Sequence, residues 1–156
     1  MAHFSRRTSA PEISGQNYRR FRAAVRDDFR SSCAYCLLNE KWAAGKENFE
    51  IDHFRPQSLF PQLALSFYNL YWSCHVCNKF KGPQWPSKEL QRAGTGFVDL
   101  CEEEFADHFT EMPNGVWVGK TLSAIYSIEA LRLNRTHLVE LRRLLSEGAL
   151  QQQEDL

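Results

Sequence analysis

Apolar and polar positions follow distinct spacings along the first half of the chain. Between Gln16 and Arg30 the apolar residues recur at helical intervals, which predicts an amphipathic helix with its arginines on the outer face. NFEIDHFRP, residues 48–56, alternates apolar and polar positions until its proline, which predicts a strand. NLYWSC, residues 69–74, predicts a second short strand, and the segment 75–81 predicts a helix that ends at Gly82-Pro83.

The second half of the chain contains further short strands and then helices. GFVDL (96–100) and GVWVG (115–119) are typical of strands, with MPNG as the turn before the second. A stripe of Leu122, Ile125, Ile128 and Leu131 predicts one helix. Asn134 is the predicted cap of a second, leucine-rich helix that closes near Gly148. Together these elements predict an α+β fold.

The length of 156 residues favours one domain, and the composition, 43% apolar and 24% charged, is ordinary for a globular chain. We expect a flexible N-terminal arm at 1–15, a single domain at 16–148 with its core at 31–83 and a C-terminal extension at 95–148, and a frayed tail at 149–156. The N-terminal sequence does not resemble a signal peptide, and no apolar run is long enough to span a bilayer. A cytoplasmic location without membrane contact is therefore expected.

Charge is distributed unevenly, although the formal net charge is zero. Residues 1–30 carry seven arginines against three carboxylates, and residues 31–98 carry seven basic against five acidic side chains. Residues 99–156 carry five basic against eleven acidic side chains. A polyanion would be attracted to the first two-thirds of the chain, although solvated helix faces explain the same pattern.

Four of the five cysteines form two Cys-x-x-Cys pairs, CAYC (Cys33, Cys36) and CHVC (Cys74, Cys77). One such pair could be redox-active, but two pairs supply the four thiolates that a structural zinc ion prefers. The 37 residues between the pairs are more than a minimal zinc ribbon needs, so zinc would hold together the ends of an insertion. Cys101 stands alone and is expected to be a buried apolar residue.

The insertion and the residues just after it contain a second group of polar residues. If the two strands pair and the helix packs across them, then Asp52, His53 and Asn78 can converge on one point. The pattern CAYC … IDH … YNL … CHVCNKFKG resembles the HNH nuclease family, whose members carry Cys-x-x-Cys, Asp-His, a middle Asn and Cys-x-x-Cys-Asn-x-x-Lys in this order. The resemblance implies a ββα-metal (His-Me finger) core that the zinc site stabilises, flanked by the N-terminal and C-terminal helices.

Softer motifs extend the resemblance over most of residues 16–145. HFRPQS, FVDL…HF…NGVWV and LRLNRTHLVELR are similar to segments of small stand-alone HNH proteins of bacterial defence, of the Septu and retron-associated types. Those proteins act beside an ATPase, so the resemblance implies antiviral defence and a possible ATPase partner.

The site residues have distinct expected roles in hydrolysing a phosphodiester. His53 is the candidate general base, because imidazole exchanges a proton near cellular pH. Asp52 and Asn78 are candidate ligands of one catalytic Mg²⁺ or Mn²⁺, because carboxylate and amide oxygens are hard ligands. The alternatives are a singly hydrogen-bonded histidine, a solvent-facing carboxylate and a helix cap.

Three further residues are expected to support this chemistry. Asn69 is predicted to hydrogen-bond the backbone of the hairpin loop and so hold His53, although an ordinary turn asparagine is nearly as plausible. Arg55 and Lys81 are predicted to contact nucleic-acid phosphates, unless they are isolated surface cations.

Three functions are compatible with these features. The first is a metal-dependent HNH endonuclease that cuts nucleic acid, most plausibly DNA. The second is a zinc-ribbon module that binds nucleic acid or protein without cleaving it, which would not need Asp52, His53 and Asn78. The third is an adaptor or toxin subunit that is silent until an ATPase binds its helical C-terminal part.

Overall fold

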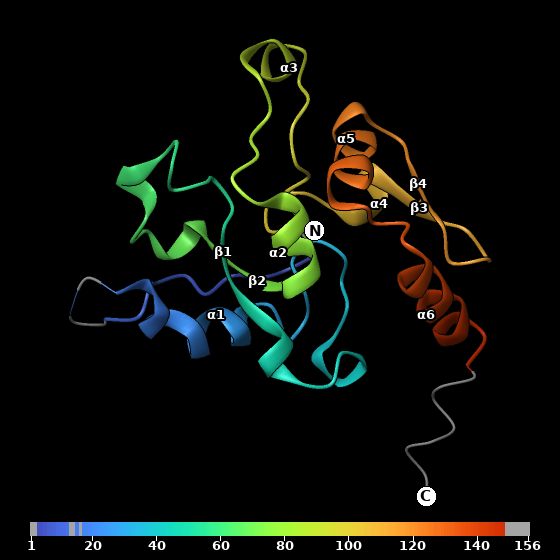
Figure 1. The fold of residues 1–156 in the computed structure, drawn as a ribbon, viewed down its shortest axis with the longest axis horizontal. Coiled ribbons are helices and arrows are strands. Elements are labelled where there is room, and N and C mark those ends of the chain that lie inside the picture. The colour runs from blue at the N-terminus through green and yellow to red at the C-terminus, as the bar shows by residue number, and fades with distance from the viewer. Residues whose placement is uncertain (1–2, 13–14, 16, 149–156) are drawn as a thin grey trace, which may run out of the picture.

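The structure is a computed structural model that describes residues 3–12, 15 and 17–148, and its fold is α+β, as predicted (Figure 1). Two antiparallel two-stranded sheets are present in this part of the chain. One pairs β1 (Phe49–His53) with β2 (Leu70–Cys74), and the other pairs β3 (Phe109–Glu111) with β4 (Trp117–Gly119). In Figure 1 the first sheet lies beside α1 (Arg22–Asp28) and α2 (His75–Lys81), whereas the second lies beside α4 (Phe105–His108) and α5 (Leu122–Leu131).

The first sheet and the helix α2 (His75–Lys81) form a strand–strand–helix unit, which confirms the elements predicted for residues 49–81. The register places Asp52 opposite Tyr71 and His53 opposite Leu70, and α2 contacts both strands. Cys74 begins α2, since its side chain accepts a hydrogen bond from the N–H of Cys77. Gly82, with a φ of 48°, and the following proline end the helix, because neither continues an α-helical ladder.

The predicted N-terminal helix is shorter than expected. A 3-10 turn at Tyr18–Phe21 leads into α1 (Arg22–Asp28), which packs on the first sheet. Arg30 and Ser31 follow with positive φ, a conformation that a right-handed helix cannot contain, so the helix ends before them.

The prediction of a loose arm at 1–15 is wrong for residues 3–12. The Phe4 side chain is buried in the core, and its ring lies 4.8 Å from that of Phe29. Arg6 and Arg7 both bind the carboxylate of Asp28, at 3.0 Å and 2.7 Å. Sequence periodicity did not show this, because the segment is held by isolated anchors rather than by a regular element.

The predicted strand at GFVDL is also absent. The N–H groups of Gly96 and Val98 donate to the hydroxyls of Ser123 and Ser127 on α5 (Leu122–Leu131) instead of to a strand. The strand at GVWVG is present as β4, and its partner β3 was not predicted. A short helix, α4 (Phe105–His108), leads into β3.

The two predicted C-terminal helices are present, but the buried face of the first and the N-cap of the second differ from the predictions. In α5, Ala124, Ser127 and Leu131 are buried, whereas Leu122 and Ile125 of the predicted stripe are exposed. Asn134 does not cap α6 (Thr136–Ser146). Its side-chain amide instead binds the backbone N–H and C=O of Trp117, which ties β4 to the connection between α5 and α6. The predicted closure near Gly148 agrees with its φ of 70°, and the predicted tail at 149–156 lies outside the described residues.

The remaining elements are short. The helix α3 (Lys88–Arg92) stands at the tip of a loop that extends away from the other helices in Figure 1. Four more 3-10 turns connect the larger elements: Glu40–Trp42, Lys46–Asn48, Pro61–Leu63 and Phe67–Asn69. Within the described residues, no helix combines the length and the apolar character needed to cross a membrane.

Candidate active site and metal centre

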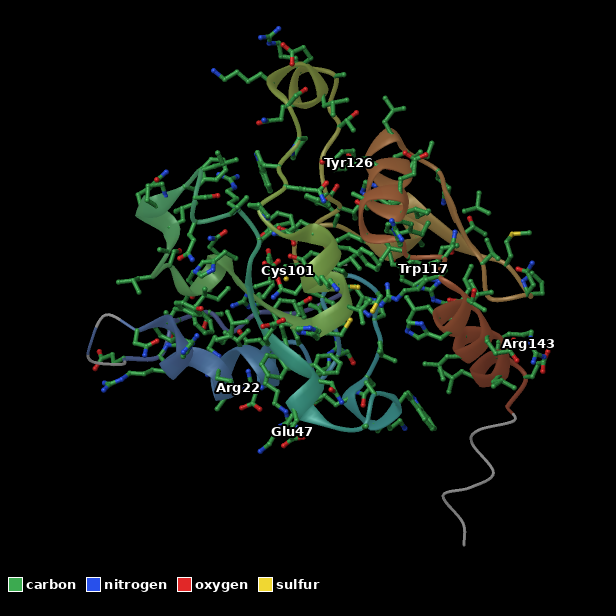
Figure 2. All side chains as sticks on the ribbon, in the orientation of Figure 1. Arg22, Glu47, Cys101, Trp117, Tyr126 and Arg143 are labelled. Atoms are coloured by element: carbon green, nitrogen blue, oxygen red, sulfur yellow. The ribbon has the colours of Figure 1, made fainter. Side chains whose placement is uncertain are left out.

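The four paired cysteines converge as predicted. Their sulfur atoms all lie within 4.8 Å of one another, and all four residues are buried. Tetrahedral zinc with bonds of about 2.3 Å holds its sulfur ligands roughly 3.8 Å apart. The Sγ atoms of Cys36 and Cys74 are 3.8 Å apart, so the cluster fits a structural zinc ion. In Figure 2 yellow sulfur atoms gather beside α2.

Backbone hydrogen bonds shape the first Cys-x-x-Cys loop around this cluster. Leu37 has a φ of 62°, and its N–H donates to the C=O of Cys33 at 3.0 Å. The N–H of Ala34 donates to the C=O of Trp72 at 2.8 Å, which attaches the loop to β2. Burial opposes ionisation of Cys33, yet the neighbouring thiols Cys36, Cys74 and Cys77 stabilise its thiolate and bring its pKa well below the usual value.

Asp52 lies at the centre of a buried polar group between β1 and α2. Its Oδ2 accepts a hydrogen bond from the Tyr35 hydroxyl and lies 3.0 Å from the ammonium of Lys81. Burial raises the pKa of Asp52, whereas Lys81 and Tyr35 act in the opposite direction. Both contacts engage Oδ2, so Oδ1 is the oxygen that remains for a cation.

Lys81 requires a correction to its predicted contact with nucleic acid. Its side chain is fully buried, and Nζ donates to the C=O of His53 at 2.8 Å as well as pairing with Asp52. An ammonium with these partners cannot reach a phosphate on the surface. Its function in the structure is to compensate the charge of Asp52 and to join the end of α2 to β1.

His53 is held in one tautomer by the loop between the two strands. Its Nε2 lies 2.9 Å from the C=O of Ala64, and Tyr18 packs edge-on against the ring at 4.8 Å. A carbonyl oxygen only accepts hydrogen bonds, so Nε2 carries a proton, and in the neutral imidazole Nδ1 is then the nitrogen with the free lone pair. Nδ1 makes no hydrogen bond to any residue that the structure describes. The free nitrogen has the form that a general base requires.

Asn69 binds that same loop at two points. Its Oδ1 accepts from the N–H of Arg55 at 2.9 Å, and its Nδ2 donates to the C=O of Arg55 at 3.0 Å and of Leu63 at 3.3 Å. Leu63 precedes the residue that binds His53. The amide therefore lies where it can fix the backbone that orients the imidazole.

A pocket of about 240 Å³ opens over these residues, lined by Asp52, His53, Pro56, Gln57, Ser58, Gly82 and Pro83. Asn78 is not part of this lining. It lies on α2, half-buried, three residues before Lys81 and so on the same helix face. Arg55 is exposed, with its guanidinium 5.8 Å from the ring centre of Phe60 and 5.9 Å from that of Trp85. The structure thus brings Asp52 and His53 together at one pocket, whereas Asn78 lies on α2 outside the lining of that pocket.

Residues 33–84 match the model of the HNH endonuclease family. The match begins at the first paired cysteine and ends just after α2, so it contains both Cys-x-x-Cys pairs and the strand–strand–helix unit. This segment is an HNH domain.

The likeness to other proteins extends beyond the HNH domain. Over 117 residues the chain is 27% identical to the Septu protein PtuB of Bacillus thuringiensis, a match that covers 74% of this chain and 41% of that protein. The chain spans about two-fifths of the length of this curated relative. The match agrees with the Septu-type resemblance seen in the sequence.

Two residues that contact polar groups of the HNH domain could not be assigned from the sequence. Tyr35, between the first two cysteines, is the hydroxyl partner of Asp52. Arg135 contacts the thiol cluster from far along the chain, 99 residues after Cys36. The position of Tyr35 inside CAYC was a usable signal, whereas no spacing in the sequence links Arg135 to the cysteines.

Proposed function

We propose that this chain is a metal-dependent HNH endonuclease that hydrolyses phosphodiester bonds of DNA. The observation that carries the proposal is that His53 and Asp52 line one pocket, with Nε2 of His53 bound to the C=O of Ala64 and Nδ1 without a hydrogen-bond partner among the described residues. A histidine that only stabilised the fold would not need to line a pocket together with a carboxylate. The family match of residues 33–84 supports the same conclusion.

Each residue has a proposed part in the reaction. His53 Nδ1 takes the proton of an attacking water, and the carbonyl of Ala64 stabilises the imidazolium that results. Asn69 keeps the Ala64 segment in place, and exposed Arg55 binds a phosphate of the backbone. Asp52 Oδ1 and Asn78 offer hard oxygen ligands that suit Mg²⁺ or Mn²⁺. When bound, such an ion would supply charge neutralisation at the phosphate and the leaving oxygen.

The test is cleavage of supercoiled plasmid DNA by the purified chain with Mg²⁺ or Mn²⁺. We expect nicking that His53→Ala reduces by about 100-fold or more, the usual range for loss of a general base. His75→Ala is the matched control, because His75 is an exposed histidine whose Nδ1 lies 3.0 Å from Glu50. Equal nicking by the two variants would contradict the proposal.

A non-cleaving binding module is the second candidate, and the Asp52–Lys81 pair favours it. A buried ammonium already neutralises the carboxylate, as would suffice in a protein without a catalytic ion. Isothermal titration with Mn²⁺ separates the two: binding that Asp52→Asn and Asn78→Ala each abolish supports the nuclease. DNA binding without a divalent-ion site supports the module.

The proposal also places the enzyme in antiviral defence beside an ATPase partner, in the reducing interior of a bacterial cell. Similarity to the Septu protein PtuB supports the role in defence. Four converging thiols without a disulfide support the reducing location. Co-expression with the product of the neighbouring gene, followed by size-exclusion chromatography and the nicking assay, tests the partnership. Separate elution and unchanged nicking would count against an ATPase partner.

A further inference from the structure

Arg135 reaches the thiol cluster from the C-terminal part of the chain. Its Nη1 and Nη2 each lie 3.5 Å from the Sγ of Cys77, and Nη2 also lies 3.7 Å from Cys74 and 3.9 Å from Cys36. Among the described residues Arg135 donates no hydrogen bond to Cys33, whose Sγ lies 3.9 Å from the hydroxyl of Ser73. One guanidinium therefore covers three of the four sulfur atoms.

The backbone around Arg135 holds this orientation. Arg135 immediately precedes α6, and its N–H donates to the C=O of Arg132 at 3.1 Å. Nη1 also approaches the C=O of Leu131 at 3.4 Å and of Arg132 at 3.3 Å, while Nε is buried and has no partner among the described residues. The guanidinium is thus partly desolvated, and its closest anionic partners are the thiolates.

Charge explains why such a contact is favourable. Four thiolates around one Zn²⁺ leave a net charge of −2 in a buried place, which is costly unless a cation compensates it. A guanidinium stays protonated at every pH at which proteins are folded, so Arg135 supplies a fixed positive charge beside the sulfur atoms. The planar fork of arginine can donate to several sulfur atoms at once, which a lysine cannot do.

We propose that Arg135 is a positioning residue of the zinc centre: it compensates the charge of the tetrathiolate and makes its thiolates less nucleophilic. N–H···S hydrogen bonds withdraw electron density from sulfur, most strongly at Cys77, which receives two of them. The zinc centre is therefore completed by the C-terminal extension, outside the matched segment 33–84. This inference concerns the structural metal and does not depend on nuclease activity.

The first experiment compares Arg135→Gln and Arg135→Met with Arg143→Gln. Arg143 is the matched control, since it lies on α6, as Figure 2 shows, and pairs with Glu140 and Glu147. The zinc-loaded proteins are treated with methyl methanethiosulfonate, and released zinc is measured with a chromogenic chelator. We expect both Arg135 variants to release zinc about tenfold faster than the native protein, because each loses hydrogen bonds from a charged group. The rate for Arg143→Gln should stay within twofold of the native rate. Release from the Arg135 variants at the native rate would overturn the proposal.

A second readout reports on the sulfur atoms themselves. After replacement of zinc by Co²⁺, the sulfur-to-cobalt charge-transfer bands should move to lower energy in Arg135→Gln, because its thiolates donate more readily. The bands of Arg143→Gln should stay at the native position. A change in folding alone would weaken the spectrum without shifting it, and that result overturns the electronic role.

A third measurement uses the native chain and needs no variant to fold. During partial alkylation of the zinc-loaded protein, peptide mass spectrometry follows each ligand cysteine separately. We expect Cys77 to react last among the four, and Cys33, to which Arg135 donates no hydrogen bond, to react before it. Reaction of Cys77 first, or at the rate of Cys33, contradicts the proposal.

Discussion

The side-chain amide of Asn69 joins the beginning of the loop that follows β1 to a later part of that loop. The side chain is buried and binds both backbone groups of Arg55 and the C=O of Leu63. Because Ala64 follows Leu63 and fixes Nε2 of His53, a change at Asn69 should reach the imidazole through one peptide unit. Substitutions at Asn69 can therefore show separately how the loop contributes to stability and how it contributes to the proposed chemistry.

We predict that Asn69→Ala lowers the free energy of unfolding by about 1–3 kcal/mol, because buried carbonyl groups lose their donor. Asn69→Asp should lower the free energy of unfolding further, since a carboxylate keeps the acceptor for the N–H of Arg55 but cannot donate to the two carbonyl groups. Urea denaturation measures both. Asn114→Ala is the control, because Asn114 accepts one bond from Val116 on an exposed turn and should change stability by less than about 0.5 kcal/mol. A loss of nicking activity in folded Asn69→Ala would show that the loop also orients His53.

Cys101 gives a prediction on pH dependence. Burial and the neighbouring Asp99 raise its pKa from 9.0 to about 12. At pH 8 its thiolate fraction should be about a thousandfold lower in the folded protein than in urea, so iodoacetamide should modify it that much more slowly. Peptide mass spectrometry measures the two rates. Equal rates in the folded and unfolded protein would show that the thiol is not shielded.

The same shift makes stability depend on alkaline pH. A thiol whose pKa is raised by folding contributes stability that is complete below pH 9 and is lost as the pH rises toward 12. Cys101→Ala should therefore show a smaller loss of stability over that range than the native chain. Ionisation of the ligand cysteines does not enter the comparison, because both proteins retain them.

The roles of individual residues could be predicted from the sequence only where neighbouring residues form a recognisable local pattern. The cysteine pairs and the adjacent Asp52 and His53 stand out by spacing alone. Lys81 looked like a surface cation, because a sequence does not show that the last turn of α2 points its ammonium into the interior. Tyr35 and Arg135 act through contacts made across the fold, which a sequence cannot display before the fold is known.

At the scale of elements, the chain was predictable where each element is stabilised by its own residues. The strands and helix of residues 49–81 are bounded by proline, a capping cysteine and glycine, so their positions followed from the sequence. GFVDL has the composition of a strand, yet the N–H groups of Gly96 and Val98 bind serine hydroxyls of α5 and not another strand. Tertiary contacts decide such short segments.

The N-terminal segment shows how an irregular element can be held firmly. Phe4 is buried against Phe29, and the N–H of Phe4 donates to the C=O of Leu100 at 2.9 Å. The segment thereby joins α1 to the connection before β3. Its anchoring is stronger than its lack of periodicity indicates.

We predict that Phe4→Ala lowers the free energy of unfolding by about 3–5 kcal/mol, the usual cost of removing a buried phenyl ring. Leu59→Ala is the control, because Leu59 is 58% exposed and should cost less than about 0.5 kcal/mol. Urea denaturation at equilibrium compares the two. A loss below about 1 kcal/mol for Phe4→Ala would mean that the segment does not belong to the core.

At the scale of the whole molecule, the thiol cluster is where distant parts of the chain meet. Cys33 and Cys36 follow α1, Cys74 and Cys77 join β2 to α2, and Arg135 adds the start of α6. The two small sheets share no strand, and the metal centre joins the two halves of the molecule together with the common hydrophobic core. We therefore propose that residues 16–148 fold as one unit around it.

Removal of zinc should for this reason unfold the chain rather than loosen one loop. Zinc binding to small structural sites contributes about 10–16 kcal/mol, which equals or exceeds the 5–15 kcal/mol that stabilises a typical domain. A strong chelator such as TPEN, added under reducing conditions, should abolish the cooperative thermal transition seen by circular dichroism. Zinc restored with reductant should recover it. Cys74→Ser should behave like the chelated protein, whereas Cys101→Ala, which leaves the cluster intact, should retain one zinc per chain.

The proposed catalytic ion should respond differently from the structural zinc. Asp52 lines an open pocket, so brief treatment with EDTA should remove Mg²⁺ and stop nicking without altering the circular dichroism spectrum. Added Mg²⁺ should restore cleavage at once, because the zinc-stabilised fold persists throughout. If EDTA and TPEN instead abolished fold and activity together at equal rates, one metal site would serve both purposes. The separation between the thiolate centre and an oxygen site at the pocket would then be wrong.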